Sequence, residues 1–203
     1  DTNYYETFNR ENVTLVDVSE SPIDKITSEG LRVSRSDYAL DSIVFATGFD
    51  AMTGAMLDID IRVEGGVSLA DAWQHGPSSY LGLTVAGFPN LFMITGPGSP
   101  GVKSQMILSI EQHVDFVADC LQHMRSRRKS QVEAETEAEQ NWVSHVKAVA
   151  DATLYPLANS WYMGANIPGK PQIFMPYVGG VDKYKKKCDE IVADGYKGFS
   201  FAS

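Results

Sequence analysis

The chain has 203 residues, of which 43% are hydrophobic and 21% charged, so it can form one large domain or two small ones. Its formal net charge of -9 argues against nucleic-acid binding, and no apolar run approaches the roughly 20 residues of a membrane span. Cys120 and Cys188 form no C-x-x-C motif and no signal peptide is visible, which favours a cytoplasmic protein with reduced thiols. The four histidines lack metal-site spacing, so we expect no metal.

The first part of the chain predicts short antiparallel strands. It begins at Asp1 without an initiator Met, which suggests a piece of a larger protein. Residues 13–18 alternate apolar and polar side chains, and a turn at 28–30 separates two further short apolar segments. We expect this set to lead into a strand at residues 41–45.

That strand would end in a turn of small residues. Leu40 to Phe45 is a branched and aromatic run typical of a buried parallel strand, and Ala46-Thr47-Gly48 follows it. Such a turn allows a backbone to approach a cofactor closely. The pattern D-x-I-V-x-A-T-G-F-D resembles the segment that links the nicotinamide and flavin domains in flavoproteins with two dinucleotide-binding domains. Any buried strand ending in a glycine turn is the alternative.

A second strand, glycine loop and helix follow a loop-rich excursion that holds a helical turn or two at Leu69 to Trp73. Phe88 to Thr95 predicts the strand, 96–101 the loop, and a helix spans about Ser104 to Arg125. The helix start makes an anion site, which suits the negative charge of a reduced flavin; the loop is not a phosphate cradle. The predicted apolar stripe of this helix consists of Met106, Ile107, Ile110, Val114, Val117, Leu121 and Met124.

The last part of the chain predicts two helices around an irregular loop. A capping box at 130–133 opens a helix to about Leu154, whose glutamates at 133, 135, 137 and 139 we expect to be solvated. The loop 158–171 lies either over a ligand or in a core. Residues 173–175 predict a short strand, and residues 181–193 a helix that stops at Gly195.

These segments together resemble the C-terminal part of Baeyer-Villiger monooxygenases of the phenylacetone and cyclohexanone monooxygenase group. The resemblance covers essentially the whole chain in one ordered set of motifs. The set consists of N-Y-Y-E-T-F-N at 3–9, L-D-S-I-V-F-A-T-G-F-D at 40–50, Y-L-G-L-T at 80–84, G-F-P-N-L-F at 87–92, G-P-G-S-P at 96–100, S-I-E-Q-H-V at 109–114 and S-W-Y-M-G-A-N-I-P-G-K-P at 160–171.

The resemblance implies an activity and a set of site residues. NADPH reduces FAD, O2 gives a flavin C4a-peroxide, and a ketone is converted to an ester or lactone. It places Trp161 on a mobile loop, near 158–171, that reaches the nicotinamide cofactor. It implies that FAD lies near Ala46, Thr47, Gly48, Phe49, Asp50 and Met106. It implies that the substrate pocket contains Thr95, Pro100, Gly101, Val102, Lys103, Ile107 and Met175.

Departures from the family pattern limit what the chain can do alone. Both nucleotide fingerprints are missing, and the family's catalytic arginine would lie upstream of Asp1, so no catalytic residue is assigned. Lys103 is charged where these enzymes are more apolar, which leaves the ketone open. We expect the isolated chain to be inactive. We expect its partner to be a missing N-terminal portion of the same protein.

The fold class that follows is α/β, with incomplete Rossmann-like sheets and helices. Residues 1–45 would end an NADPH-binding domain, and residues 46–203 would form the C-terminal part of an FAD-binding domain. Two alternatives remain: a flavin monooxygenase that oxidises nitrogen or sulfur, and a non-catalytic stand-alone module.

Overall fold

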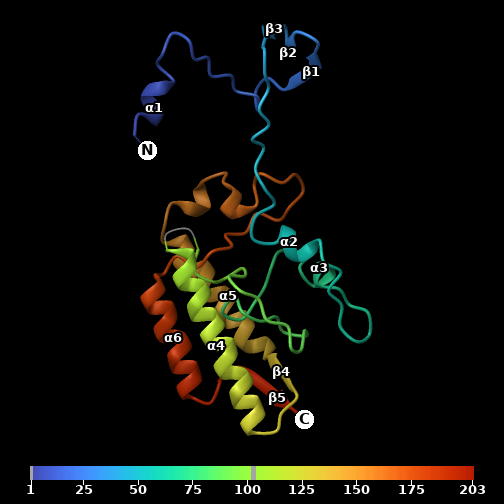
Figure 1. Ribbon diagram of the computed structural model, residues 1–203, viewed down its shortest axis with the longest axis vertical. Helices are drawn as coiled ribbons and strands as arrows, with labels where there is room; N and C mark the ends of the chain where they lie inside the picture. Colours follow the sequence, from blue (N-terminus) through green and yellow to red (C-terminus); the bar gives the residue numbers. More distant parts are fainter. Residues whose placement is uncertain (1, 102–103) are drawn as a thin grey trace. The chain divides into compact units, whose positions relative to one another are not determined.

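The computed structural model describes residues 2–101 and 104–203, which form two compact units (Figure 1). The first unit ends at Thr47 and the second begins at Gly48. The assignment of the two parts of the chain to NADPH-binding and FAD-binding domains stays a prediction.

The first unit is built on a small antiparallel sheet in the order β1-β2-β3. A short helix precedes this sheet. The elements are α1 (Tyr4–Thr7), β1 (Ile23–Thr27), β2 (Gly30–Val33) and β3 (Ser36–Ala39). Gly30 is required where β2 begins, because a Cβ atom there would lie 1.9 Å from the Tyr38 carbonyl oxygen. The antiparallel prediction is confirmed for the part from Ile23 onward, but residues 13–18 form no strand.

The predicted buried strand at 41–45 is wrong, because these residues have no regular secondary structure. The side chains of Val44 and Phe45 are 87% and 71% exposed. A strand exists only when its backbone groups pair with a neighbour, and none of the described strands pairs with this segment. Residues 41–45 therefore form an exposed apolar segment and not a buried strand.

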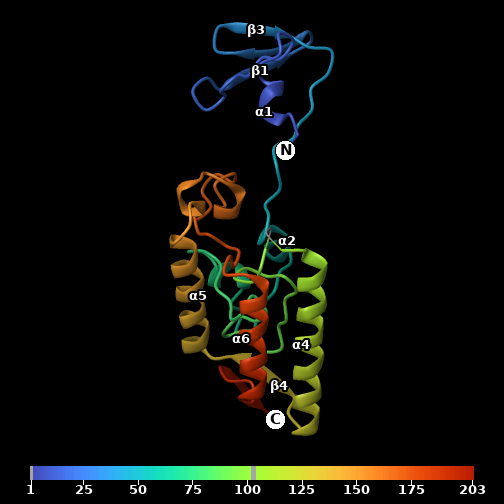
Figure 2. The same ribbon diagram turned by 90° about the vertical axis from the view of Figure 1, so that its left-hand side faces the viewer.

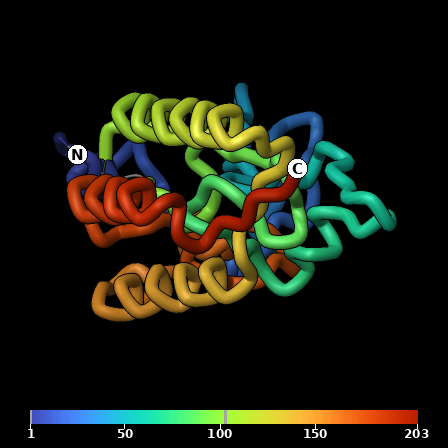
Figure 3. The backbone as a smooth tube through the Cα atoms, turned by 90° about the horizontal axis from the view of Figure 1, so that it is seen from below, coloured from blue at the N-terminus to red at the C-terminus, as the bar shows by residue number. Residues whose placement is uncertain are grey.

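Three long helices dominate the second unit and lie side by side, with α6 between α4 and α5 (Figures 2 and 3). The starts of α4 and α6 are at the same end of this unit as the end of α5, and the small antiparallel sheet β4-β5 is at the other end (Figure 2). The long helices are α4 (Met106–Ser126), α5 (Thr136–Asp151) and α6 (Val181–Ala193). The shorter elements are α2 (Gly54–Leu57), α3 (Leu69–Ala72), β4 (Gln131–Ala134), β5 (Phe199–Ala202) and the 3-10 helices η1 (Tyr155–Leu157) and η2 (Trp161–Met163).

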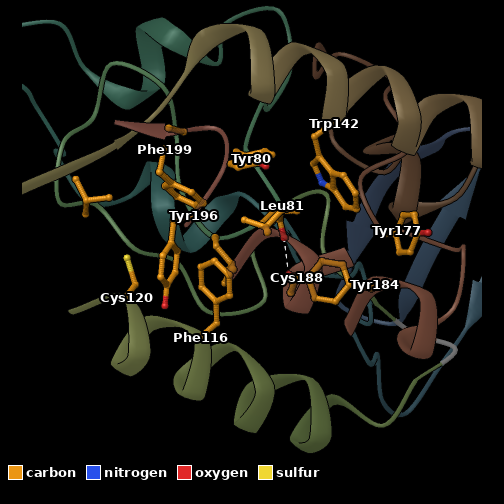
Figure 4. Packing of buried hydrophobic residues seen from close by; sticks show 14 of the residues in the cluster. Tyr80, Leu81, Phe116, Cys120, Trp142, Tyr177, Tyr184, Cys188, Tyr196 and Phe199 are labelled. Atoms are coloured by element: carbon orange, nitrogen blue, oxygen red, sulfur yellow. Dashed lines mark hydrogen bonds between the residues drawn. The ribbon is translucent and has the colours of Figure 1, made fainter. Parts of the chain in front are cut away.

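The main core lies between these helices and is rich in aromatic side chains (Figure 4). Phe116 and Cys120 enter it from α4, Trp142 from α5, and Tyr184 and Cys188 from α6. Both cysteines are free and buried, and burial raises the pKa of each thiol to about 11. The thiols are therefore inert, small apolar groups in the folded protein.

The helix predictions are confirmed more closely than the strand predictions. α3 and α6 lie where they were expected, and the lysines at 183 and 185–187 are exposed. Gly195 has a φ of +70°, the left-handed conformation that commonly follows a helix end. The inner face of α5 includes the buried apolar side chains of Trp142, Val146 and Ala150.

Helix α4 forms as predicted, but most of the predicted apolar stripe does not enter the core. Of its seven members only Met124 is buried. The face that enters the core consists of Ser109, His113, Phe116, Cys120 and Met124. The helix carries two neighbouring stripes that both contain large side chains, and apolar periodicity cannot tell which of them meets a partner in this chain.

Three further expectations are wrong. Residues 88–95 and 173–175 are not strands, and 130–133 is not a capping box, since β4 occupies 131–134. The expected solvated surface of glutamates is also only partly correct. Glu139 is buried and accepts a hydrogen bond from the Ala86 N–H at 2.7 Å, while Glu133 accepts one from the Gly87 N–H at 2.8 Å. Burial raises the pKa of the Glu139 carboxyl.

The expected α/β fold class is confirmed, since the helices and small sheets are those of a partial α/β domain. Within residues 2–101 and 104–203, no helix is both long enough and apolar enough to cross a bilayer.

Candidate ligand site at the start of helix α4

The glycine loop 96–101 packs against the chain segment that follows the 158–171 loop. The Gly98 N–H donates to the Met175 carbonyl at 2.7 Å, and the Tyr177 N–H donates to the Ser99 carbonyl at 2.8 Å. A Cβ atom on Gly101 would lie 2.8 Å from Cβ of Pro176, so glycine is needed for this contact. The structure therefore brings together three predicted pocket residues, Pro100, Gly101 and Met175.

Helix α4 begins at Met106, a few residues after this loop. Its N-cap residue, Gln105, makes no side-chain capping hydrogen bond. The first N–H groups of the helix thus carry the positive pole of a 21-residue helix without a side-chain cap from Gln105. Met106 and Ile107 are 41% and 62% exposed beside this pole. A flat ligand with an apolar face and an electron-rich edge would match this combination.

The 158–171 loop is held by backbone hydrogen bonds to the same segment. The Met175 N–H donates to the Tyr162 carbonyl at 3.1 Å, and the Ile173 N–H donates to the Met163 carbonyl at 3.1 Å. Trp161 stacks against Tyr162 with ring centroids 3.9 Å apart, yet remains 40% exposed. The buried residue of this turn is Met163, so Trp161 is not the core anchor of the loop.

The same loop also binds the last two residues of the predicted linker. The Asn166 side-chain amide donates to the Phe49 carbonyl at 2.9 Å. The Lys170 ammonium forms an ion pair with the Asp50 carboxylate, and the Lys170 side chain is only 11% exposed. These contacts place Phe49 and Asp50 against the loop that carries Trp161. Sequence reasoning missed Asn166 and Lys170 as site residues, although both lie in the most irregular motif of the chain.

The predicted site residues are divided between the two units. Ala46 and Thr47 belong to the first unit, whereas Gly48 begins the second. Val102 and Lys103 lie outside the described residues. The predicted residues of the second unit are Gly48, Phe49, Asp50, Thr95, Pro100, Gly101, Met106, Ile107, Trp161 and Met175. Their roles toward a cofactor or substrate stay predictions.

Thr95 is held by a buried network that the sequence reasoning missed. Its N–H donates to His113 Nδ1 at 2.9 Å, so in the neutral ring Nε2 carries the proton. His113 Nε2 lies 3.0 Å from the Tyr184 hydroxyl, and that hydroxyl donates to the Leu81 carbonyl at 2.7 Å (Figure 4). Desolvation lowers the pKa of His113 to about 4, and burial raises the pKa of Tyr184 well above its ordinary value.

An apolar cavity of about 410 Å³ lies on the α5 side of Met175. Its walls include Pro97 and Gly98 of the glycine loop and Trp142 and Val146 of α5. The cavity is large enough for a small organic molecule. Among the described residues, no group of three or more His, Cys, Asp or Glu side chains is arranged to hold a metal ion.

Comparison with known proteins gives the class. A scan of protein-family models finds no match. A Baeyer-Villiger monooxygenase of Pseudooceanicola batsensis is 43% identical over 195 residues, which are 96% of this chain and 35% of that protein. Cyclohexanone 1,2-monooxygenase of an Acinetobacter species is 40% identical over 200 residues, 98% of this chain and 36% of that protein. Phenazine N-monooxygenase of Lysobacter antibioticus is 38% identical over 197 residues, 97% of this chain and 36% of that protein.

Solved structures agree with this result. Cyclohexanone monooxygenase from Rhodococcus sp. Phi1, bound to NADP+, superposes with a TM-score of 0.91 at 39% identity and covers 100% of this chain and 38% of that one. By these names, all four proteins are monooxygenases. Within that class, the chain is a homologue of the Baeyer-Villiger monooxygenases, as its motifs predicted. It spans a little over one third of the length of these relatives, from 35% to 38%.

Proposed function

We propose that this chain is the C-terminal portion of a Baeyer-Villiger monooxygenase and supplies one side of its flavin and ketone sites. In the proposed reaction a ketone, O2, NADPH and a proton give an ester or lactone, water and NADP+. The observation that carries the proposal is that the glycine loop 96–101 and the 158–171 loop both hydrogen-bond to Met175, and that α4 begins a few residues after this glycine loop. The similarity of the whole chain to Baeyer-Villiger monooxygenases supports it.

The residues at the start of α4 fit an isoalloxazine ring. The uncapped helix pole would stabilise an electron-rich ring edge by about 0.3–1 kcal/mol if exposed, and more if buried. The side chains of Met106 and Ile107 offer an apolar surface beside that pole. When bound, FAD would supply the redox chemistry. This chain would orient the ring and provide the glycine-loop wall of the ketone pocket.

The loop at 158–171 fits a role over the nicotinamide cofactor. Trp161 is exposed enough to contact a ligand, and its indole N–H can donate one hydrogen bond while the ring excludes water. The ion pair of Lys170 with Asp50 would tie this loop to the linker between the two dinucleotide-binding domains. The remaining portion of the protein would supply the pyrophosphate-binding glycine motifs and a cationic catalytic residue.

The test is a hybrid enzyme. The matching segment of the Acinetobacter cyclohexanone 1,2-monooxygenase is replaced by this chain, and bound flavin and ketone-dependent NADPH oxidation are measured. We expect a yellow protein that converts cyclic or aryl ketones to esters or lactones. A folded hybrid that binds FAD but oxidises no ketone would contradict the proposal, whereas one that oxidises only amines or sulfides would support the second candidate.

That second candidate is oxidation of nitrogen. It is favoured by the 38% identity to phenazine N-monooxygenase, which is close to the 40% identity to cyclohexanone 1,2-monooxygenase. Parallel assays of the hybrid with cyclic ketones, aryl ketones and phenazine separate the two reactions. A non-catalytic module would instead give a hybrid that folds without binding flavin.

A further inference from the structure

Two residues near the proposed site adopt a conformation that side chains normally avoid. Thr95 has a φ of +58° and Leu81 a φ of +61°, both in the left-handed region. Neither is glycine, and Thr is β-branched, so each conformation is strained and needs support from its surroundings. The two loops that carry these residues also contact each other, because the Gly96 N–H donates to the Gly82 carbonyl at 3.1 Å.

One pair of side chains reaches both strained residues. His113 of α4 accepts from the Thr95 N–H at 2.9 Å, and Tyr184 of α6 donates to the Leu81 carbonyl at 2.7 Å. The imidazole and the phenol also contact each other, with His113 Nε2 3.0 Å from the Tyr184 oxygen. Both side chains are completely buried, so water does not compete for these hydrogen bonds.

The direction of the hydrogen bonds fixes the form of the ring. An N–H points at Nδ1, so the neutral ring must carry its proton on Nε2, and that proton is donated to the Tyr184 oxygen. The phenol then has one proton left to donate, and it goes to Leu81. This tautomer therefore gives a hydrogen-bond partner to the Thr95 N–H, both His113 ring nitrogens, the Tyr184 hydroxyl and the Leu81 carbonyl.

We propose that His113 is a positioning residue of the ketone pocket, because its Nε2-protonated ring and Tyr184 together hold Thr95 and Leu81 in the left-handed conformation. The inference rests on the proposed function, in which Thr95, Pro100 and Gly101 form part of the pocket wall. His113 does not contact substrate in this role. It sets the direction in which the chain leaves Thr95 and enters the glycine loop.

The first test uses the 203-residue chain and requires no variant. Nitrogen NMR of His113 should show the Nε2-protonated tautomer. The Nδ1-protonated form would overturn the proposal, since that ring cannot accept from Thr95.

The second test compares two substitutions of similar size. His113→Asn places an amide oxygen near the position of Nδ1, and His113→Gln places one near Nε2. We expect the hydrogen-exchange protection factor of the Thr95 amide to stay unchanged in H113N. In H113Q this protection factor should fall about 10-fold or more. Equal loss in both variants, or loss in neither, would show that His113 acts only by filling space.

The third test measures ketone kinetics in the hybrid enzyme. H113Q should raise KM for the ketone about 10-fold or more, and H113N should restore most of that loss while flavin binding stays unchanged in both. Unchanged KM in H113Q would overturn the positioning role. If the hybrid with the unsubstituted chain oxidises no ketone, the proposed function is contradicted instead. The hydrogen-exchange and tautomer measurements would still decide whether His113 positions Thr95.

Discussion

At the scale of single residues, the most consequential side chain is one that carries no charge. His113 is completely buried in α4, and desolvation lowers its pKa from 6.5 to about 4. The folded protein therefore keeps this ring neutral at pH values where the unfolded chain protonates it. Its two nitrogens can then serve two different partners.

The stability of the chain should depend on this histidine between pH 6.5 and 4. Because the unfolded state binds the extra proton in this window, the free energy of unfolding should fall as the pH falls, by up to about 3 kcal/mol. Glu139 acts in the opposite direction, since burial raises its pKa and favours the folded state on acidification. Urea unfolding at several pH values, for the chain and for H113N, isolates the histidine contribution as the difference between the two. Parallel pH profiles would contradict this prediction.

Tyr184→Phe should destabilise the protein although it removes only one oxygen. The Leu81 carbonyl and the His113 Nε2–H would both lose a buried partner, which costs about 1–3 kcal/mol for each group. Chemical denaturation measures the change. Tyr5→Phe is a suitable control, because this tyrosine is 73% exposed. Loss of less than about 1 kcal/mol in Y184F would show that water replaces the phenol oxygen.

At the scale of elements, the 158–171 loop depends on contacts distant in sequence. Lys170 and Asp50 are 120 positions apart and form a half-buried ion pair. In a double-mutant cycle, Lys170→Met and Asp50→Asn should show a coupling energy of about 1 kcal/mol, above the usual value for exposed pairs. The exposed pair Lys185 and Asp189 on α6 serves as the comparison and should couple more weakly. Equal coupling in the two pairs would mean that solvent screens both equally.

Helix α4 presents an apolar face that the described residues leave uncovered. Ile107, Val114 and Leu121 are 62%, 49% and 49% exposed, whereas Phe116 on the opposite face is 4% exposed. Replacing the three exposed residues with Gln should reduce binding of a hydrophobic fluorescent dye and change stability by less than about 0.5 kcal/mol per site. Phe116→Ala should instead cost about 3–5 kcal/mol. Unchanged dye binding in the triple variant would place the dye site elsewhere.

Helices were predictable from this sequence because their signals are local. The spacing of Tyr184, Cys188 and Ile191 and the stop at Gly195 define α6 without reference to the rest of the protein. Strands were not predictable in the same way. Residues 41–45 and 88–95 have the apolar runs of buried strands, but a strand also needs a paired neighbour, which a local pattern cannot supply. The network of His113 was invisible for the same reason, since its partners are 18 and 71 positions away.

At the scale of the whole molecule, the chain is two units of unequal size joined by an exposed apolar segment. The first unit has 47 residues and a sheet of three short strands, which is small for an independently stable domain. Phe45 and Phe49 are 71% and 88% exposed at the junction. The junction should therefore be the weakest point of the chain toward proteases.

Limited digestion with chymotrypsin should cleave first after Phe45 or Phe49. Mass spectrometry should detect an early, persistent product that begins near Ala46 or Asp50 and extends to Ser203, because the three long helices protect the rest of the second unit. Digestion after the buried Phe116 or Tyr184 at equal or earlier times would show instead that the helical core opens as readily as the junction.

The labelling rates of the buried thiols of Cys120 and Cys188 measure how often that core opens. Each lies on the inner face of a different helix, α4 and α6, and neither can react as a thiolate while it stays buried. Labelling by a thiol reagent must wait for the two helices to separate. If both cysteines are modified at one common rate, α4 and α6 separate from the core as a single cooperative unit. If the rates differ, the faster one identifies the helix that separates first, and therefore the side of the ligand site that unfolds first.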